Sequence, residues 1–169
     1  MKKIKKISKY NILVINIIIF LLFFIGANAY VSINYLTARE KVKKFELENL
    51  YGFYTPESEG DIIYNWTGKE AVKVVKKKGD VIYIPVGNDR PDIEDKSVDL
   101  KIFVNNEMKY NGLVDSNEWQ VIPIDASGIG DDYLMIKFIV GDTWKPADLV
   151  EGSEDNRNLG IKAGMIYWE

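Results

Sequence analysis

The sequence predicts an all-β fold, an antiparallel β-sandwich of jelly-roll type, preceded by one N-terminal transmembrane helix. A long charge-free apolar run near the start of the chain predicts the helix. Beyond it, apolar and polar residues alternate with a period of two, which is typical of half-buried strands. Turn residues separate these stretches without helical segments between them, and this pattern favours an antiparallel sandwich.

The predicted transmembrane helix covers residues 10–38, about 29 residues without a charge, which exceeds the roughly 20 that span a bilayer. Five lysines and no acid precede it, whereas basic and acidic residues are mixed after it. The positive-inside rule therefore predicts a cytoplasmic N-terminus and an extracytoplasmic C-terminal domain. We expect a single-pass protein of the cell membrane, held in the lipid bilayer by a signal-anchor helix.

A second interpretation of the same segment stays open. Ala27-Asn28-Ala29 has the small-x-small form of a signal-peptidase site, and cleavage there would release a soluble protein that starts at Tyr30. Apolar residues resume at Tyr30 and Val31, which favours a retained anchor over a cleaved signal peptide.

The remaining boundaries follow from local composition. Residues 1–9 are expected to be a basic cytoplasmic tail, residues 39–55 a helical stalk or linker, and residues 56–169 the extracytoplasmic β-sandwich domain. The stalk is rich in helix-forming residues, and Gly52 and Pro56 disfavour its continuation.

About eight strands are expected in the domain. They are Ile62 to Trp66, Ala71 to Val75, Val81 to Val86, Val98 to Val104, Met108 to Leu113, Glu118 to Ile124, Leu134 to Val140 and Ile161 to Trp168. The Cys-Trp-Cys pattern of immunoglobulin domains is absent, so we favour a jelly-roll order.

Composition excludes several classes of function. With no cysteine and no histidine, the chain has no disulfide, thiol nucleophile, imidazole base or common zinc ligand. It also has no nucleotide-binding glycine loop, so we expect that it is not itself a glycosyltransferase. Taken together, we expect a protein that is not an enzyme, with no catalytic residue, cofactor or metal site. The chain has 22 basic and 25 acidic residues. Because five lysines lie in the first nine residues, the rest carries 17 − 25 = −8 and should repel nucleic acid.

Calcium is the one metal that the acidic residues suggest. Asp142, Glu151, Glu154 and Asp155 could supply oxygen ligands, but the EF-hand spacing is absent. We therefore expect a solvated acidic loop here.

Two motifs carry a resemblance to a known family. Asn65-Trp66-Thr67 lies near the start of the domain, and Trp144-Lys145-Pro146 is followed by Asp155-Asn156-Arg157-Asn158-Leu159-Gly160 near its end. From about residue 51 to 168 the chain resembles a carbohydrate-binding-module-like β-sandwich domain that occurs attached to bacterial membrane glycosyltransferases or alone behind one membrane helix. It departs from that pattern at Asn65, where arginine is expected, and at Asn156, where proline is common. The resemblance implies a place in cell-envelope glycan assembly and no particular reaction.

The candidate ligand-binding residues are Trp66, Trp144, Arg157 and Asp155. An indole offers a rigid amphipathic face on which a sugar ring packs, and a guanidinium fork clamps a carboxylate or phosphate. In the alternative interpretation the two tryptophans plug the end of the sandwich, and Arg157 pairs with Asp155 to fix the turn before the last strand. Trp119 and Trp168 are assigned to the core or its edge.

The leading hypothesis is a membrane-anchored, extracytoplasmic glycan-binding accessory domain that assists assembly of envelope polysaccharide or glycoconjugate. Its expected partners are a glycan or glycan carrier and a membrane glycosyltransferase. The alternative is a non-catalytic scaffold that docks on a membrane glycosyltransferase or another envelope protein and has no sugar site.

Overall fold

The computed structural model describes the backbone of residues 9–169 and the side chains of residues 17–37 and 48–169. The chain forms two compact units, residues 1–41 and 42–169, and each is described by itself. Apart from Lys9, the basic tail expected over residues 1–9 lies outside the described residues.

Helix α1 (Lys9–Glu48) contains the predicted apolar segment. Its stretch Ile17–Thr37 is 21 residues long, and all its side chains are exposed in the isolated chain. It is long and apolar enough to cross a membrane, and a signal sequence near the N-terminus would meet the same criteria.

The end of α1 corrects the expected domain boundary. Residues 49–55, predicted as stalk or linker, belong to strand β1 (Asn49–Glu59), which pairs with β2 (Ile62–Lys76). The pairing shifts register three times between Asn49 and Pro56. Gly52 has a φ of +78°, and a Cβ added there would lie 2.0 Å from the carbonyl oxygen of Glu70. The glycine that disfavoured a helix therefore marks an irregularity inside a strand, where only glycine fits.

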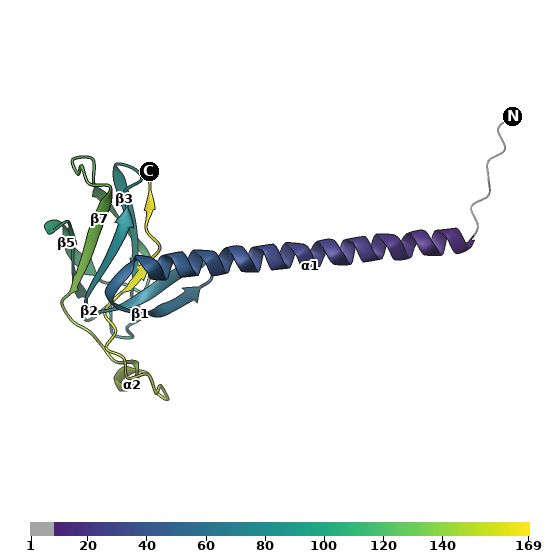
Figure 1. The fold of residues 1–169 in the computed structure, drawn as a ribbon. Coiled ribbons are helices and arrows are strands. Elements are labelled where there is room, and N and C mark those ends of the chain that lie inside the picture. The colour runs from purple at the N-terminus through teal and green to yellow at the C-terminus, as the bar shows by residue number, and fades with distance from the viewer. Residues whose placement is uncertain (1–8) are drawn as a thin grey trace. The chain divides into compact units, whose positions relative to one another are not determined.

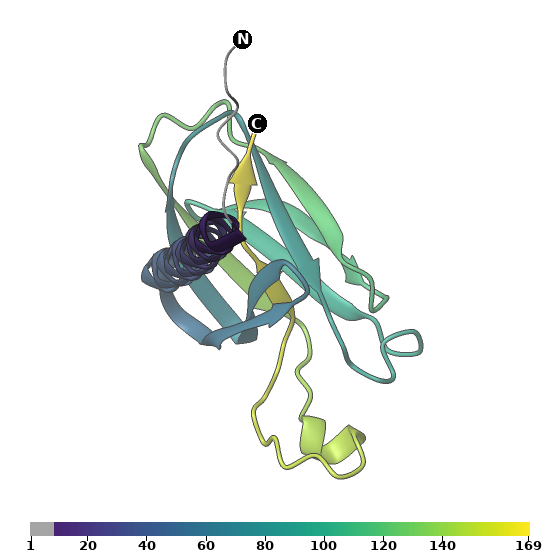
Figure 2. The same ribbon diagram turned by 90° about the vertical axis from the view of Figure 1, so that its right-hand side faces the viewer.

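The other elements complete an antiparallel fold (Figures 1 and 2). They are β3 (Val81–Gly87), β4 (Val98–Val104), β5 (Glu107–Val114), β6 (Gln120–Asp125), β7 (Tyr133–Val140), the short helix α2 (Pro146–Leu149), β8 (Lys162–Gly164) and β9 (Tyr167–Trp168). The hydrogen-bonded order is β5-β4-β7-β2-β8-β3-β6, with β1 also on β2 and β9 on β3.

Strand β2 connects the two layers of the sandwich. Its second half, Glu70–Lys76, pairs with β7, whereas Tyr64–Trp66 in its first half pairs with β8. The two strands expected at residues 62–66 and 71–75 are thus one 15-residue strand. Conversely, the single strand expected over residues 161–168 is divided into β8 and β9.

The main core lies between the layers, because one buried cluster takes residues from both. Strands β4 and β7 contribute Leu100, Ile102, Val104, Leu134, Ile136, Phe138 and Val140, and strands β3 and β6 contribute Ile82, Ile84, Val86, Ile122 and Ile124. In β4 and β7 every second residue is buried, as the alternating sequence predicts. The predicted β-sandwich behind an apolar helix is confirmed.

Candidate functional site

The two predicted tryptophans lie in a second, aromatic cluster, with Tyr64 and Leu159. Trp66 is 4% exposed and Trp144 is 7% exposed, and their rings meet edge to face with centroids 6.0 Å apart. Neither indole presents an open face to a sugar in this structure. Their burial corresponds to the alternative interpretation, in which they plug the end of the sandwich.

Arg157 and Asp155 form the pair that the alternative interpretation describes. Arg157 donates from Nε to Asp155 at 3.0 Å and from Nη2 at 2.7 Å, and Nη1 donates to Glu57 at 2.8 Å. These bonds raise the pKa of Arg157, and its guanidinium lowers the pKa of Asp155. The guanidinium also lies 5.3 Å from the centroid of the Tyr54 ring. The whole fork is therefore engaged in tying the last loop to β1.

The motifs that carry the family resemblance contact each other. The backbone N–H of Ile161 donates to Oγ1 of Thr67 at 3.0 Å, and that of Gly160 donates to the Thr67 carbonyl at 2.7 Å. A Cβ on Gly160 would lie 2.5 Å from the carbonyl oxygen of Gly68, so only glycine permits this approach. Asn65 is fully buried and donates to the carbonyl of Tyr54 at 2.7 Å. These residues hold the strands together.

Beside this cluster, the outer face of the β2-β8-β3 sheet carries a charged residue that sequence reasoning did not select. Lys162 of β8 is paired in register with Trp66 of β2 and with Gly87 of β3. Its neighbours Ile161 and Ala163 belong to the main core, so the Lys162 side chain lies on the opposite, outer face. A Cβ on Gly87 would be only 3.2 Å from Lys162 Cε and 3.3 Å from the Trp119 ring. Gly87 thus leaves room for both side chains.

Lys162 joins two carboxylates to an indole, and we call Glu59, Asp89, Trp119 and Lys162 the Lys162 site. The Lys162 side chain is 0% exposed, and its Nζ donates to Glu59 at 2.6 Å and to Asp89 at 2.5 Å. Nζ also lies 4.8 Å from the centroid of the Trp119 ring. Trp119 Nε1 donates to Glu59 Oε2 at 3.2 Å. Two carboxylates and one indole are therefore fixed by a buried ammonium.

The carboxylates of the Lys162 site remain accessible. The side chains of Glu59 and Asp89 are 56% and 48% exposed. Lys162 donates to Oε2 of Glu59 and Oδ1 of Asp89, so the described residues supply no donor to the second oxygen of either group. The hydrogen bond from Lys162 lowers the pKa of Glu59. Burial is the main cause that raises the pKa of the adjacent Tyr64 to about 12.

The charge around the Lys162 site is negative. Glu57, Glu59, Asp89 and Asp155 supply four carboxylates, against the two basic groups of Lys162 and Arg157. The arrangement accepts hydrogen bonds from neutral hydroxyls and repels anions.

The acidic residues considered for calcium are dispersed. Among the described residues, no three acidic side chains lie close enough together to hold a metal ion. Asp142 accepts a 2.9 Å bond from Arg90, whose side chain is 7% exposed, and Asp155 is held by Arg157.

Sequence reasoning did not select Trp119 or Lys162 as candidate binding residues, for a different reason in each case. Trp119, assigned to the core or its edge, is partly buried and lies just before β6. Lys162 gave one usable signal, a single lysine between the apolar residues Ile161 and Ala163 of an expected strand. Its partners come from residues 73 and 103 positions away, which no local pattern indicates.

Comparisons with known proteins place the chain near carbohydrate-binding modules at low similarity. No family model matches it, and no curated protein does. ZmpB of Clostridium perfringens, solved with a catalytic domain and two CBM51 domains, is 22% identical over 64% of this chain and 11% of that chain, with a TM-score of 0.36. The CBM51 domain of Clostridium perfringens GH95, solved with methyl-galactose, is 17% identical over 70% and 80% of the two chains, with a TM-score of 0.36. A CBM4 structure is 10% identical over 68% and 75%, with a TM-score of 0.35.

The chain thus spans 11% of the solved ZmpB chain. Because similar folds carry unrelated functions, the function of this chain has to be argued from its own residues.

Proposed function

We propose that this protein is a membrane-anchored, non-catalytic glycan-binding domain that holds neutral sugars at the Lys162 site. One observation carries the proposal: a fully buried lysine fixes two half-exposed carboxylates beside a partly exposed indole.

The chemistry of a sugar matches each part of this site. The apolar C–H face of a sugar ring packs on an aromatic surface such as Trp119. Hydroxyl groups donate hydrogen bonds to the open oxygens of Glu59 and Asp89. Because Lys162 already orders both carboxylates, binding costs little additional side-chain entropy.

The electrostatics favour binding over hydrolysis. A glycosidase needs a carboxylic acid with a raised pKa that stays protonated and gives its proton to the leaving oxygen. Lys162 lowers the pKa of Glu59, so this carboxylate stays ionised and acts as a hydrogen-bond acceptor. The excess of carboxylates around the site also favours neutral sugars over uronic acids or phosphates.

The apolar helix supplies the location in this proposal. The basic residues before it give a cytoplasmic N-terminus, and α1 then holds the sandwich at the outer surface of the membrane. There the domain assists a membrane glycosyltransferase in assembling envelope polysaccharide or glycoconjugate.

A scaffold without a sugar site is the second candidate. The burial of Trp66 and Trp144 favours it, because the two residues first selected as platforms act as packing groups. A scaffold would bind its membrane partner whether or not Trp119 is present.

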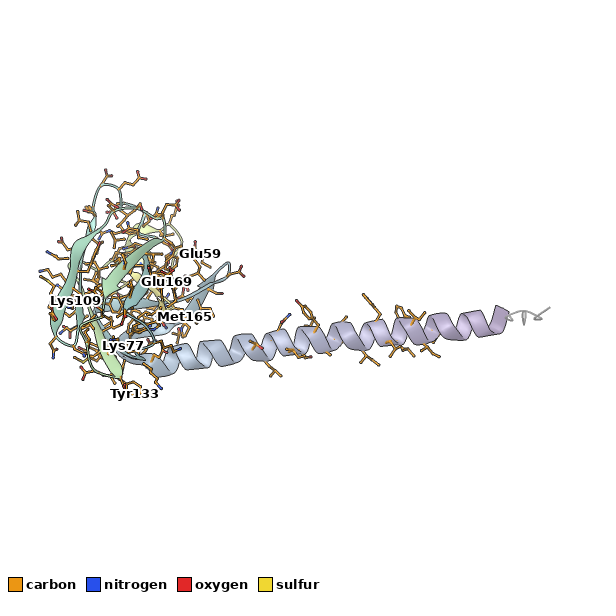
Figure 3. All side chains as sticks on the ribbon, turned by 90° about the horizontal axis from the view of Figure 1, so that it is seen from above. Glu59, Lys77, Lys109, Tyr133, Met165 and Glu169 are labelled. Carbon is orange, nitrogen blue, oxygen red and sulfur yellow. The ribbon has the colours of Figure 1, made fainter. Side chains whose placement is uncertain are left out.

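Binding of the full chain to sugars tests the proposal. The protein is placed in lipid nanodiscs, because the sugar headgroups of maltoside detergents would compete for the site. It is then applied to an array of neutral and uronic-acid oligosaccharides. The variants are Trp119→Ala and Asp89→Ala. The matched control is Tyr133→Ala, an aromatic side chain that is 61% exposed on β7, on the other side of the domain from Glu59 (Figure 3).

We expect neutral oligosaccharides to bind to the parent protein and uronic-acid oligosaccharides to bind only weakly. Trp119→Ala weakens binding about tenfold or more, and Tyr133→Ala leaves it unchanged. A folded parent that binds no sugar, or that binds equally well without Trp119, would refute the proposal.

A further inference from the structure

The sheet face that carries the Lys162 site continues into an uncharged strip. In β3, Ile82, Ile84 and Val86 belong to the core, so Tyr83 and Pro85 lie on the outer face with Gly87. In β6, Ile122 and Ile124 are the core residues, and Val121 and Pro123 are outer. We call Tyr83, Pro85, Val121, Pro123 and Tyr167 the tyrosine strip.

Strand register places these side chains next to one another. Tyr83 is paired with Tyr167 of β9 on one side and with Pro123 of β6 on the other, and Pro85 is paired with Val121. A Cβ on Gly164 would lie 2.9 Å from the Pro85 Cβ, so a glycine packs directly beside this proline. The strip therefore connects directly with Gly87 and the Lys162 site along β3.

The far end of the strip is aromatic. The rings of Tyr83 and Tyr167 are stacked, with centroids 5.1 Å apart and planes at 8°. The Tyr83 hydroxyl donates to Glu169 Oε2 at 2.8 Å, which fixes the pair further. Tyr167 and Val121 are each 46% exposed, so the strip reaches solvent.

The length of the strip decides what it would hold. Gly87, which contacts Trp119, and Tyr83 are four positions apart in β3, a distance of about 14 Å at about 3.4 Å per residue. A six-membered ring with bonds of about 1.5 Å is only about 3 Å across. One sugar ring on Trp119 therefore cannot reach the tyrosines, whereas a chain of several rings can.

We infer that the ligand is a neutral oligosaccharide chain, which lies along β3 from Trp119 to the stacked Tyr83–Tyr167 pair. This inference rests on the proposed function. The five positions of the strip carry no charge, and carboxylates lie near both ends, Glu59 and Asp89 at one and Glu169 at the other. An anionic polymer would meet repulsion at both ends, and a neutral chain would gain hydroxyl acceptors there.

Length-dependent binding tests the inference. The full chain in nanodiscs is titrated with neutral oligosaccharides of increasing length, taken from the series that binds best. The variants are Tyr167→Ala and, because Tyr83 contributes more to packing, the milder Tyr83→Leu. Tyr133→Ala is the exposed-tyrosine control, Trp119→Ala reports on the Lys162 site, and circular dichroism checks that each variant is folded.

Affinity should rise with chain length until the ligand spans the strip. Tyr167→Ala and Tyr83→Leu should weaken the longest ligands about three- to tenfold and leave the shortest unchanged. If the long ligands bind these folded variants as they bind the parent, the inference is overturned, while loss of binding in Trp119→Ala still supports the proposed function. If Trp119→Ala has no effect on any ligand, the proposed function fails as well.

Discussion

The interior of the sandwich and the outer face at the Lys162 site each bury a lysine, in different surroundings. Lys73 is 0% exposed beside the core, with Nζ 5.3 Å from the Phe53 ring, and Phe53 packs edge to face on Phe138. Burial lowers the pKa of Lys73 to about 8, and Glu48 opposes that shift. Lys162 is equally buried, and it donates to two surface carboxylates at 2.6 and 2.5 Å.

The different surroundings of Lys73 and Lys162 indicate that the interior contributes mainly to stability and the outer face mainly to recognition. The aliphatic interior gains free energy from burying apolar surface, and a charge there is a cost. On the outer face, the buried charge of Lys162 holds two carboxylates that reach solvent, and in the proposed function it thereby organises the binding surface. Changes in the interior should therefore alter stability and leave binding unchanged, whereas changes at the Lys162 site should alter binding, with or without an effect on stability.

Leu100→Ala should have the largest effect on stability. Leu100 is 0% exposed in β4, and removing such a side chain costs about 2–5 kcal/mol in the free energy of unfolding. Urea denaturation measures the loss, and sugar affinity per folded molecule should not change. A clear drop in affinity of the folded variant would break the separation between the two regions.

Lys73→Met should change how stability depends on pH. The pKa of Lys73 is about 8 in the folded state and about 10.5 when unfolded, so the unfolded chain binds more protons between these values. Stability of the parent should therefore rise with pH from about 8 upward. Methionine should remove that rise and stabilise the protein at pH 7, as read from urea midpoints between pH 7 and 9.5.

The control for this measurement is Lys76→Met, an exposed lysine of the same strand. It should keep the rise of the parent. A flat profile in the parent would contradict the lowered pKa of Lys73.

Lys162→Met should change the acid side of the stability profile. The folded pKa of Glu59 lies below its unfolded value near 4.5, because Lys162 donates a hydrogen bond to it. That contribution is complete above the unfolded pKa and is lost as pH falls through the folded one. The variant lacks it, so its stability should fall less steeply below pH 4.5, and its sugar affinity should also drop.

Lys101→Met, an exposed lysine on β4 in the other layer, is the matched control and should follow the parent in both measurements. An acid profile of Lys162→Met as steep as that of the parent would count against the role given to Lys162.

Gly87→Ala should have the smallest effect. The added Cβ would lie 3.2 Å from Lys162 Cε and 3.3 Å from the Trp119 ring. These close contacts can relax if the neighbouring side chains shift by a few tenths of an ångström. We expect a stability loss of about 1 kcal/mol and a modest drop in sugar affinity. Gly128→Ala, where a Cβ would meet open space, should change neither. Equal affinity in both variants would show that Gly87 does not help to position Trp119.

Local patterns predicted the regular parts of the fold. Alternation identified β4 and β7, and the Asn105-Asn106 turn joins β4 to β5 with φ of 48° and 70°, as a tight hairpin requires. Pairing of Arg157 with Asp155, two residues apart, was also within reach of sequence reasoning. In contrast, β1 was hidden by its register shifts, which break the period of two.

The site was harder to predict than the fold, because it depends on long-range register. Sequence identified Trp66 and Trp144 as aromatic, but only the packing of strands determines that they are buried. Likewise, Lys162 meets Glu59 and Asp89 only because β8 lies between β2 and β3.

Nuclear magnetic resonance of the indole N–H groups tests the central claim most directly. The chain has four tryptophans, and single substitutions assign their signals in isotope-labelled protein in nanodiscs. A neutral oligosaccharide should shift the Trp119 signal, which comes from the Lys162 site, and leave those of the buried Trp66 and Trp144 in place. Shifts at Trp66 or Trp144 with none at Trp119 would contradict the account and return the site to the residues that the sequence first suggested.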